Sequence, residues 1–168
     1  MLGEFSERIQ SKAIVLNYPA VANCIARLGG SETNPRKLVA ELSRERQGIR
    51  RVIRQIHIIT DAAGLPPNIR DEFVRAGANI HTAHGDRTEC LTYFHAERMA
   101  DIFDVVALIV DDSGYLPLIR RMKALGTSVE LHAMPSADPA LFPAADEVVG
   151  LYPPGAPLPL RAERSKAA

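Results

Sequence analysis

Short, nearly unbroken apolar runs recur along the chain and alternate with segments of helical periodicity. The clearest runs span residues 52–60 and 104–110, and such β-branched, continuously apolar stretches are typical of strands buried on both faces. Strands are predicted at 12–18, 52–60, 78–83, 104–110 and 127–134, with helices between them. This alternation predicts an α/β domain with three layers, in which helices cover both faces of a central parallel sheet of about five strands.

Residues 1–151 are expected to form this single domain, because a chain of 168 residues is long enough to bury one hydrophobic core. Residues 152–168 are rich in proline and then in charge, which predicts a flexible tail with no fold of its own. Two cysteines in predicted helices indicate reducing surroundings rather than a disulfide framework. With no long apolar run and no signal-peptide pattern, we expect a soluble, cytoplasmic protein without membrane contact.

Polar side chains lie at or just after the carboxyl ends of the predicted strands, at the edge where open parallel sheets bind ligands. They are Asn17, Asp61, Asp86, Asp111, Asp112 and Ser113. Oxygen ligands suit Mg²⁺ and Mn²⁺, which offset phosphate charge and make bound water acidic. Successive strand residues point to opposite faces, so only one of Asp111 and Asp112 faces the site if the strand continues that far. Turn formation explains Asp61 equally well, and helix capping explains Asp86 and Ser113.

The segment around these aspartates, residues 103–119 (FDVVALIVDDSGYLPLI), resembles the strand-to-helix element of NYN domains, a branch of the PIN-like metal-dependent nucleases. Residues 13–16 before Asn17 look like the first strand of that family. Further downstream, the resemblance rests on Gly126, Val129, Leu141, Ala145, Asp146 and Leu151, so that it covers roughly residues 12–151. It implies a PIN-like three-layer fold and metal-dependent endoribonuclease chemistry, with Asp112 as the central metal ligand.

The chain departs from the NYN pattern at several acidic positions. Asn17 stands where the family has its first catalytic aspartate, and Gly114 where it has the second aspartate of the run. A further family acid lies early in the central helix. An ungapped alignment places Arg87 at that position, whereas a loop shorter by two residues places Glu89 there.

Two hypotheses follow from the resemblance and its gaps. The first is an active Mg²⁺- or Mn²⁺-dependent endoribonuclease, a hydrolase in which Asp112 and Glu89 act with Asp61 or Asp86 as substitute acids. The second is a degenerate member that binds RNA, a nucleotide, a protein partner or a second copy of itself without turnover. Loss of two carboxylates usually abolishes two-metal chemistry, so the sequence favours the second, with weak Mg²⁺ or Mn²⁺ binding at most.

Charge and histidines add two weaker candidates. Net charge is zero, which gives no overall attraction to nucleic acid, but seven basic residues lie between 36 and 54. Three of them, Arg44, Arg50 and Arg51, are predicted phosphate contacts, although a solvated helix face gives the same count. His81, His84 and His95 offer transition-metal ligands, but their spacing of three and eleven residues fits no standard signature.

Overall fold

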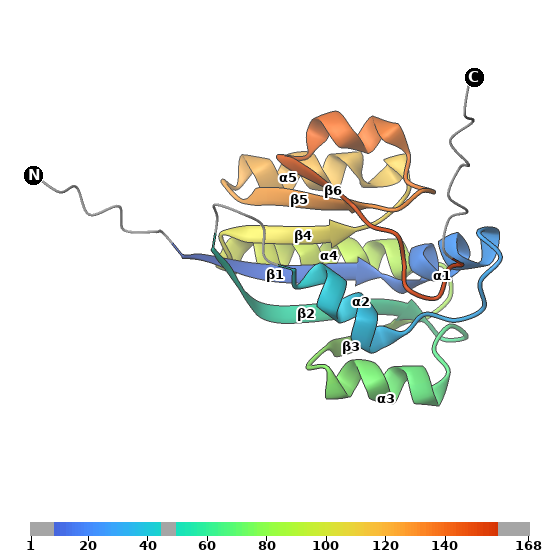
Figure 1. Cartoon of the computed structure of the whole chain (residues 1–168). Coiled ribbons are helices and arrows are strands. Elements are labelled where there is room, and N and C mark those ends of the chain that lie inside the picture. The colour runs from blue at the N-terminus through green and yellow to red at the C-terminus, as the bar shows by residue number, and fades with distance from the viewer. Residues whose placement is uncertain (1–8, 45–49, 158–168) are drawn as a thin grey trace, which may run out of the picture.

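The computed structural model describes residues 9–44 and 50–157, and within them the chain forms a three-layer α/β domain (Figure 1). The strands are β1 (Gln10–Asn17), β2 (Arg51–Asp61), β3 (Asn79–Ala83), β4 (Val105–Ile109), β5 (Ser128–Ala133) and β6 (Glu147–Gly150). All neighbours pair in parallel, in the order β3-β2-β1-β4-β5-β6. The predicted α/β class and parallel sheet are confirmed.

Helices cover both faces of this sheet, because β4 and residues 13–16 of β1 are continuously apolar. The helices α1 (Tyr18–Arg27), α2 (Pro35–Leu42) and α3 (Pro67–Arg75) pack on one face, against side chains such as Leu16 and Ile58. The opposite face is covered by α4 (Thr88–Ile102) and α5 (Leu116–Ala124), which pack against Val15 and Leu108. Among the described residues, no helix is long and apolar enough to cross a membrane.

The sheet differs from the prediction by a sixth strand. β6 pairs with β5 at the edge, and its four residues alternate between half-buried and exposed. So short an edge strand lacks the long apolar run that identifies a central strand. A 3-10 turn, η1 (Ser113–Tyr115), leads directly into α5, and a second such turn, η2 (Pro139–Ala144), precedes β6.

The first residues of the predicted tail lie against the domain. Leu151, the last residue of the predicted domain, is buried and donates its backbone N–H to Ala133 O at 2.8 Å. Within the predicted tail, Pro154 O accepts from the Thr33 hydroxyl at 2.9 Å. A Cβ on Gly30 would lie 2.3 Å from the Gly155 carbonyl oxygen, so this approach requires glycine at position 30. Residues 152–157 thus contact the loop after α1, whereas residues 158–168 lie outside the described residues.

Candidate functional site

The strand order places a crevice between the carboxyl ends of β1 and β4. From β1 the chain builds outward through β2 and β3, and from β4 it builds in the opposite direction through β5 and β6. Such a reversal leaves a gap between adjacent crossover helices, and open α/β sheets bind ligands there. Asn17 ends β1 at this crevice, and Asp111 and Asp112 follow β4.

The amide of Asn17 is fully used inside the domain. Its nitrogen donates to the Tyr115 hydroxyl at 2.9 Å and to Thr92 Oγ1 at 3.4 Å, while its oxygen accepts from Ala20 N at 3.2 Å and caps α1. Burial raises the pKa of Tyr115 to about 12, against the lowering effect of its hydrogen bonds with Thr92 and Asn17. A carboxylate at position 17 could not donate to either hydroxyl, so asparagine suits its structural surroundings here.

Asp112 and Glu89 approach each other above Gly114. A Cβ built on Gly114 would lie 3.1 Å from Asp112 Oδ1 and 3.4 Å from Glu89 Oε1. Asp112 Oδ1 also accepts from Gly114 N at 2.6 Å, which caps η1, and the Tyr93 hydroxyl donates to the Gly114 carbonyl. Glu89, which the shorter-loop alignment places at the acidic position of the NYN pattern, thus lies near Asp112. Ser113, predicted to cap the helix that follows, is instead the first residue of η1, and Asp112 is the cap.

Asp111 lines a separate part of the crevice. A hollow of about 240 Å³ is bordered by Arg27, Asp111, Asp112, Ser113, Ser136 and Asp138. Burial raises the pKa of the Asp111 carboxyl, and the neighbouring Asp112 adds to the increase, while Arg27 opposes it. The hydroxyl of Ser136 is buried without a hydrogen-bond partner. The hollow is polar and contains one arginine beside its carboxylates.

Asp61 and Asp86 do not complete a carboxylate cluster with the pair above Gly114. Asp61 ends β2, which β1 separates from β4, so the two strands lie about 10 Å apart. Its carbonyl accepts from Gly64 N at 3.3 Å, as expected of a turn residue, and Asp86 is exposed in the loop before α4. Among the described residues, a single group of three or more His, Cys, Asp or Glu side chains brings its ligand atoms within 4.8 Å of one another. That group contains only histidines, so it includes no carboxylate of this edge.

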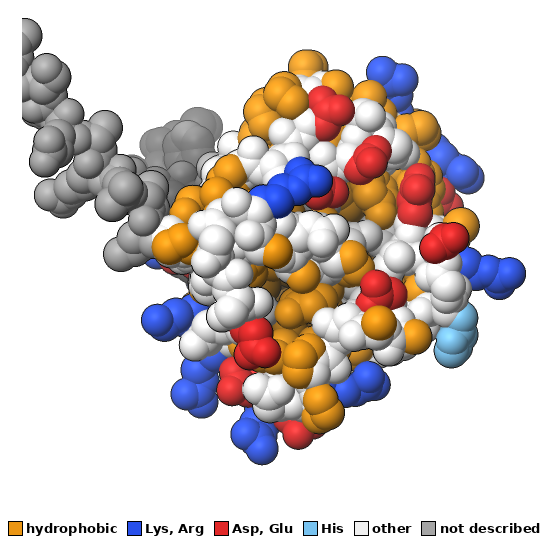
Figure 2. All heavy atoms as spheres, turned by 90° about the vertical axis from the view of Figure 1, so that its right-hand side faces the viewer, with side chains coloured by type: hydrophobic (Ala, Val, Ile, Leu, Met, Phe, Trp, Pro, Cys, Tyr) orange, Lys and Arg blue, Asp and Glu red, His pale blue; other side chains and the backbone are white. Residues whose placement is uncertain are grey.

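The carboxyl edge of the sheet is acidic at its surface. Figure 2 looks onto this edge and shows acidic side chains distributed around a hollow with apolar side chains at its base, with most lysines and arginines nearer the periphery. An anionic ligand approaching this edge meets like charge, so its binding requires a cation or a local arginine.

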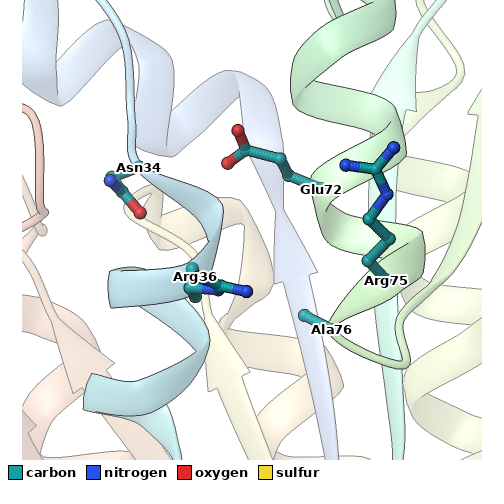
Figure 3. A pocket seen from close by; sticks show the side chains of 5 residues that line it. All are labelled: Asn34, Arg36, Glu72, Arg75 and Ala76. Carbon is teal, nitrogen blue, oxygen red and sulfur yellow. The ribbon is translucent and has the colours of Figure 1, made fainter.

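The basic segment predicted to bind phosphate does not border this edge. Arg36 lines a hollow of about 330 Å³ between α2 and α3, together with Asn34, Glu72, Arg75 and Ala76 (Figure 3). Arg36 and Glu72 extend into the space between the two helices. Arg44 is exposed and pairs with Glu41 at 2.8 Å, Arg50 is exposed immediately before β2, and Arg46 lies outside the described residues.

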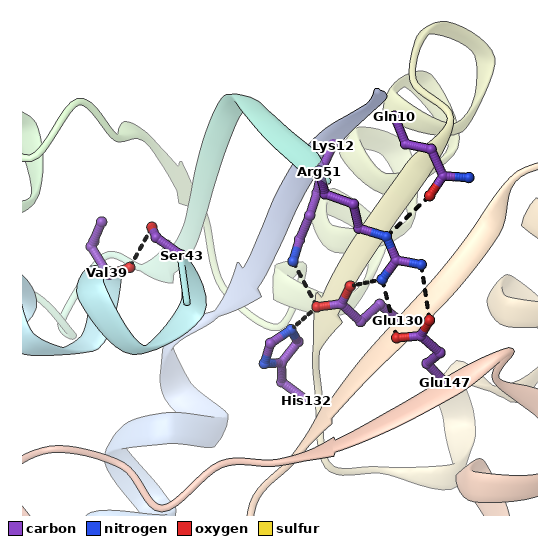
Figure 4. Close-up of polar contacts among 8 residues, drawn as sticks. All are labelled: Gln10, Lys12, Val39, Ser43, Arg51, Glu130, His132 and Glu147. Carbon is purple, nitrogen blue, oxygen red and sulfur yellow. Dashed lines mark hydrogen bonds and ion pairs between the residues drawn. The ribbon is translucent and has the colours of Figure 1, made fainter. Parts of the chain in front are cut away.

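Arg51, predicted to contact phosphate, belongs to a largely buried ion network that occupies its guanidinium. Its guanidinium donates to Glu130 at 2.6 Å and to Glu147 at 2.9 and 3.1 Å, and Lys12 reaches the other oxygen of Glu130 at 2.6 Å (Figure 4). The network joins the amino ends of β1 and β2 to β5 and β6, away from the carboxyl edge. It is a structural element that links four strands.

The histidine-only group consists of His57, His81 and His95. The sequence predicts His84 as the partner of the last two, but His84 is exposed in the loop after β3. His57 was missed because it lies inside an apolar strand, where nothing marks it as a ligand. The pairing of β2 with β3 brings His57 close to His81. Ile59 pairs with His81, and His57 lies two residues before Ile59 on the same face of β2.

The fold and the crevice define a three-layer α/β domain with an all-parallel sheet and a small acidic site at its switch point. The sequence matches no protein-family model and no curated protein. Among solved structures, it is similar to a protein of unknown function, VPA0982 from Vibrio parahaemolyticus, with a TM-score of 0.65 and 15% sequence identity. The similarity covers 83% of this chain and 91% of that chain, and at this identity it shows the shared fold.

Proposed function

We propose that this protein is a NYN-like domain without nuclease turnover, which binds phosphate groups of RNA through one divalent cation held by Asp112 and Glu89. The observation that carries the proposal is the approach of these two carboxylates to the same space above Gly114. Two carboxylate oxygens and water ligands form the kind of site that retains Mg²⁺ or Mn²⁺ weakly.

Two observations and one chemical requirement favour binding over catalysis. The amide of Asn17 is committed to Thr92, Tyr115 and α1, so it does not replace a missing carboxylate. No third acid joins the pair within ligand distance among the described residues. Two-metal hydrolysis needs carboxylates that bridge both ions, and one weakly held cation can position a phosphate without activating a nucleophile on its opposite side.

The acidic surface of the carboxyl edge gives the proposal a further consequence. Phosphate approaches this edge only after a cation has offset its charge, so RNA binding should depend on Mg²⁺ or Mn²⁺. The hollow beside Asp112 contains Arg27, which offers a cationic contact for a phosphate bound next to the ion. Binding that persists fully in a chelator would separate RNA recognition from the acidic pair.

Titration with Mn²⁺ is expected to show one weak site, with a Kd on the order of 10⁻⁴–10⁻³ M. Asp112→Asn should abolish the heat of binding, and Glu89→Gln should weaken binding about tenfold, because each removes a charged ligand. Isothermal titration calorimetry measures both. Asp86→Asn is the matched control, since Asp86 is exposed near the same edge and should leave binding unchanged. Equal binding by wild type and Asp112→Asn would contradict the proposal.

The alternative of an active endoribonuclease has one specific observation in its favour. Glu89 is close to the position that a side chain at 114 would occupy, so it can act as a partial substitute for the aspartate that the NYN pattern has there. Such an enzyme would cleave RNA with Mn²⁺, and activity would be lost in both Asp112→Asn and Glu89→Gln.

A further inference from the structure

We propose that His57, His81 and His95 form a binding site for a transition-metal ion of the Zn²⁺ class, separate from the acidic carboxyl edge. Each histidine offers one ring nitrogen, and the three nitrogens lie within 4.8 Å of one another. Imidazole nitrogen suits Zn²⁺, Cu²⁺ and Ni²⁺, and three histidines with an open fourth position form a common zinc coordination set.

Two strands and a helix bring the three rings together. His57 lies in β2, His81 in the neighbouring β3, and His95 in α4, which covers that face of the sheet. His57 and His95 are only 7% and 9% exposed, whereas His81 is half-buried near the edge of the sheet. Rigid elements thus hold the ligands, and the edge strand leaves a path for an ion to enter.

The hydrogen bonds of His57 fix its orientation as a ligand. His57 Nε2 lies 2.8 Å from Gln55 Oε1, an acceptor, so Nε2 carries the hydrogen and Nδ1 presents its lone pair. His57 Nδ1 lies 2.8 Å from His81 Nε2. A histidine ligand that donates its other N–H to an amide oxygen is the usual outer-sphere arrangement at metal sites.

Binding requires two local adjustments. His81 Nε2 now donates its hydrogen toward His57 Nδ1, so the His81 proton must move to Nδ1 of its own ring, a tautomer change that releases no net proton. The His81 and His95 rings are stacked with centroids 3.7 Å apart, whereas a metal lies in the plane of each imidazole ring that binds it. His95 must therefore turn about its side-chain bonds to aim a nitrogen at the ion.

The surroundings keep the ligands neutral. Burial lowers the pKa of all three rings, to about 4 for His57 and for His95, and the positive charge of Arg98 acts in the same direction on these two. Arg98 lies over the Phe94 ring on α4, 5.5 Å from its centroid. Neutral rings need not lose a proton to bind a metal at pH 7, although Arg98 opposes the charge of the ion.

Cobalt substitution tests the site in the intact chain. After treatment with a chelator and dialysis, addition of Co²⁺ should give the intense d–d absorption of a four-coordinate ion, saturating at one ion per chain, and Zn²⁺ should displace it. His81→Gln and His57→Gln should each remove this spectrum and weaken Zn²⁺ binding more than about 100-fold, because loss of an outer-sphere partner alone costs 10–100-fold.

Matched variants separate the site from other effects. His84→Gln removes an exposed histidine of the adjacent loop and should leave the cobalt spectrum unchanged. Gln55→Ala should retain the spectrum but weaken Zn²⁺ binding about tenfold, as expected for a positioning residue. Circular dichroism confirms that each variant is folded. An octahedral cobalt spectrum in the wild type, or a four-coordinate one that survives both His57→Gln and His81→Gln, would overturn the proposal.

Discussion

Replacement of Glu130 by glutamine is expected to lower the free energy of unfolding by about 3–5 kcal/mol, the usual cost of breaking a buried ion pair from one side. Lys12 is 5% exposed and has its ammonium 2.6 Å from Glu130. Burial alone would raise the pKa of Glu130, but hydrogen bonds from His132 and Lys12 outweigh it and lower that pKa to about 2. The substitution therefore removes a carboxylate that the folded chain stabilises in its ionised form. Urea denaturation at pH 7 measures the effect.

Glu147 provides the matched control for this prediction. It pairs with the same guanidinium as Glu130, but its side chain is 30% exposed, so Glu147→Gln should cost only about 1 kcal/mol. Adding Lys12→Met to Glu130→Gln should recover part of the loss, since it removes the ammonium left without its carboxylate. Equal losses for Glu130→Gln and Glu147→Gln would show that burial of the network contributes nothing.

Acidification from pH 6.5 to about 4 is expected to lower the stability of the metal-free protein by about 3 kcal/mol, after allowing for solvent screening of the shifted groups. The pKa values of His57 and His95 fall from 6.5 to about 4 in the folded chain, first through burial and then through nearby positive groups. Because the unfolded chain binds protons first, the histidine contribution is complete above pH 6.5 and declines as pH falls toward 4. Thermal unfolding in a chelator at several pH values measures this slope.

The variant His95→Gln should flatten the decline in this window, whereas His84→Gln, which alters an exposed ring, should not. The contribution of Glu130 falls in a lower window, between its unfolded pKa of 4.5 and its folded value of about 2, so the two effects separate. If the free energy of unfolding of the wild type stayed constant between pH 6.5 and 4, the prediction would be contradicted. Protonation of the histidine cluster, or its exposure to solvent, would then not reduce the stability of the fold.

Apolar runs were enough to predict the central strands, because β1 and β4 are buried on both faces and leave no ambiguity of pattern. They were not enough for β6, a short edge strand with exposed alternate residues. Helix starts followed local chemistry where a side chain caps the backbone, as Asn34 does by accepting from Lys37 N at 3.0 Å. Helix α3, by contrast, begins with Pro67, after Pro66, without a side-chain cap.

The candidate sites depended on contacts between distant segments, which residue spacing alone does not supply. The approach of Glu89 to Asp112 depends on the length of the loop before α4, and the alignment left two lengths open. Counting arginines between 36 and 54 could not show that Arg51 is directed into the network with Glu130. A signal was present, since a lone glutamate inside the apolar strand at 127–134 needs a buried cation as partner.

The most direct test of the proposed function is cleavage of single-stranded RNA in Mn²⁺ by wild type and Asp112→Ala, alongside RNA binding in Mn²⁺ and in a chelator. We expect RNA binding that requires Mn²⁺ and is lost in Asp112→Ala, with no cleavage above background by either protein. Robust wild-type cleavage that disappears in Asp112→Ala would contradict the account, because it would show that Asp112 and Glu89 already have the partners needed for catalysis.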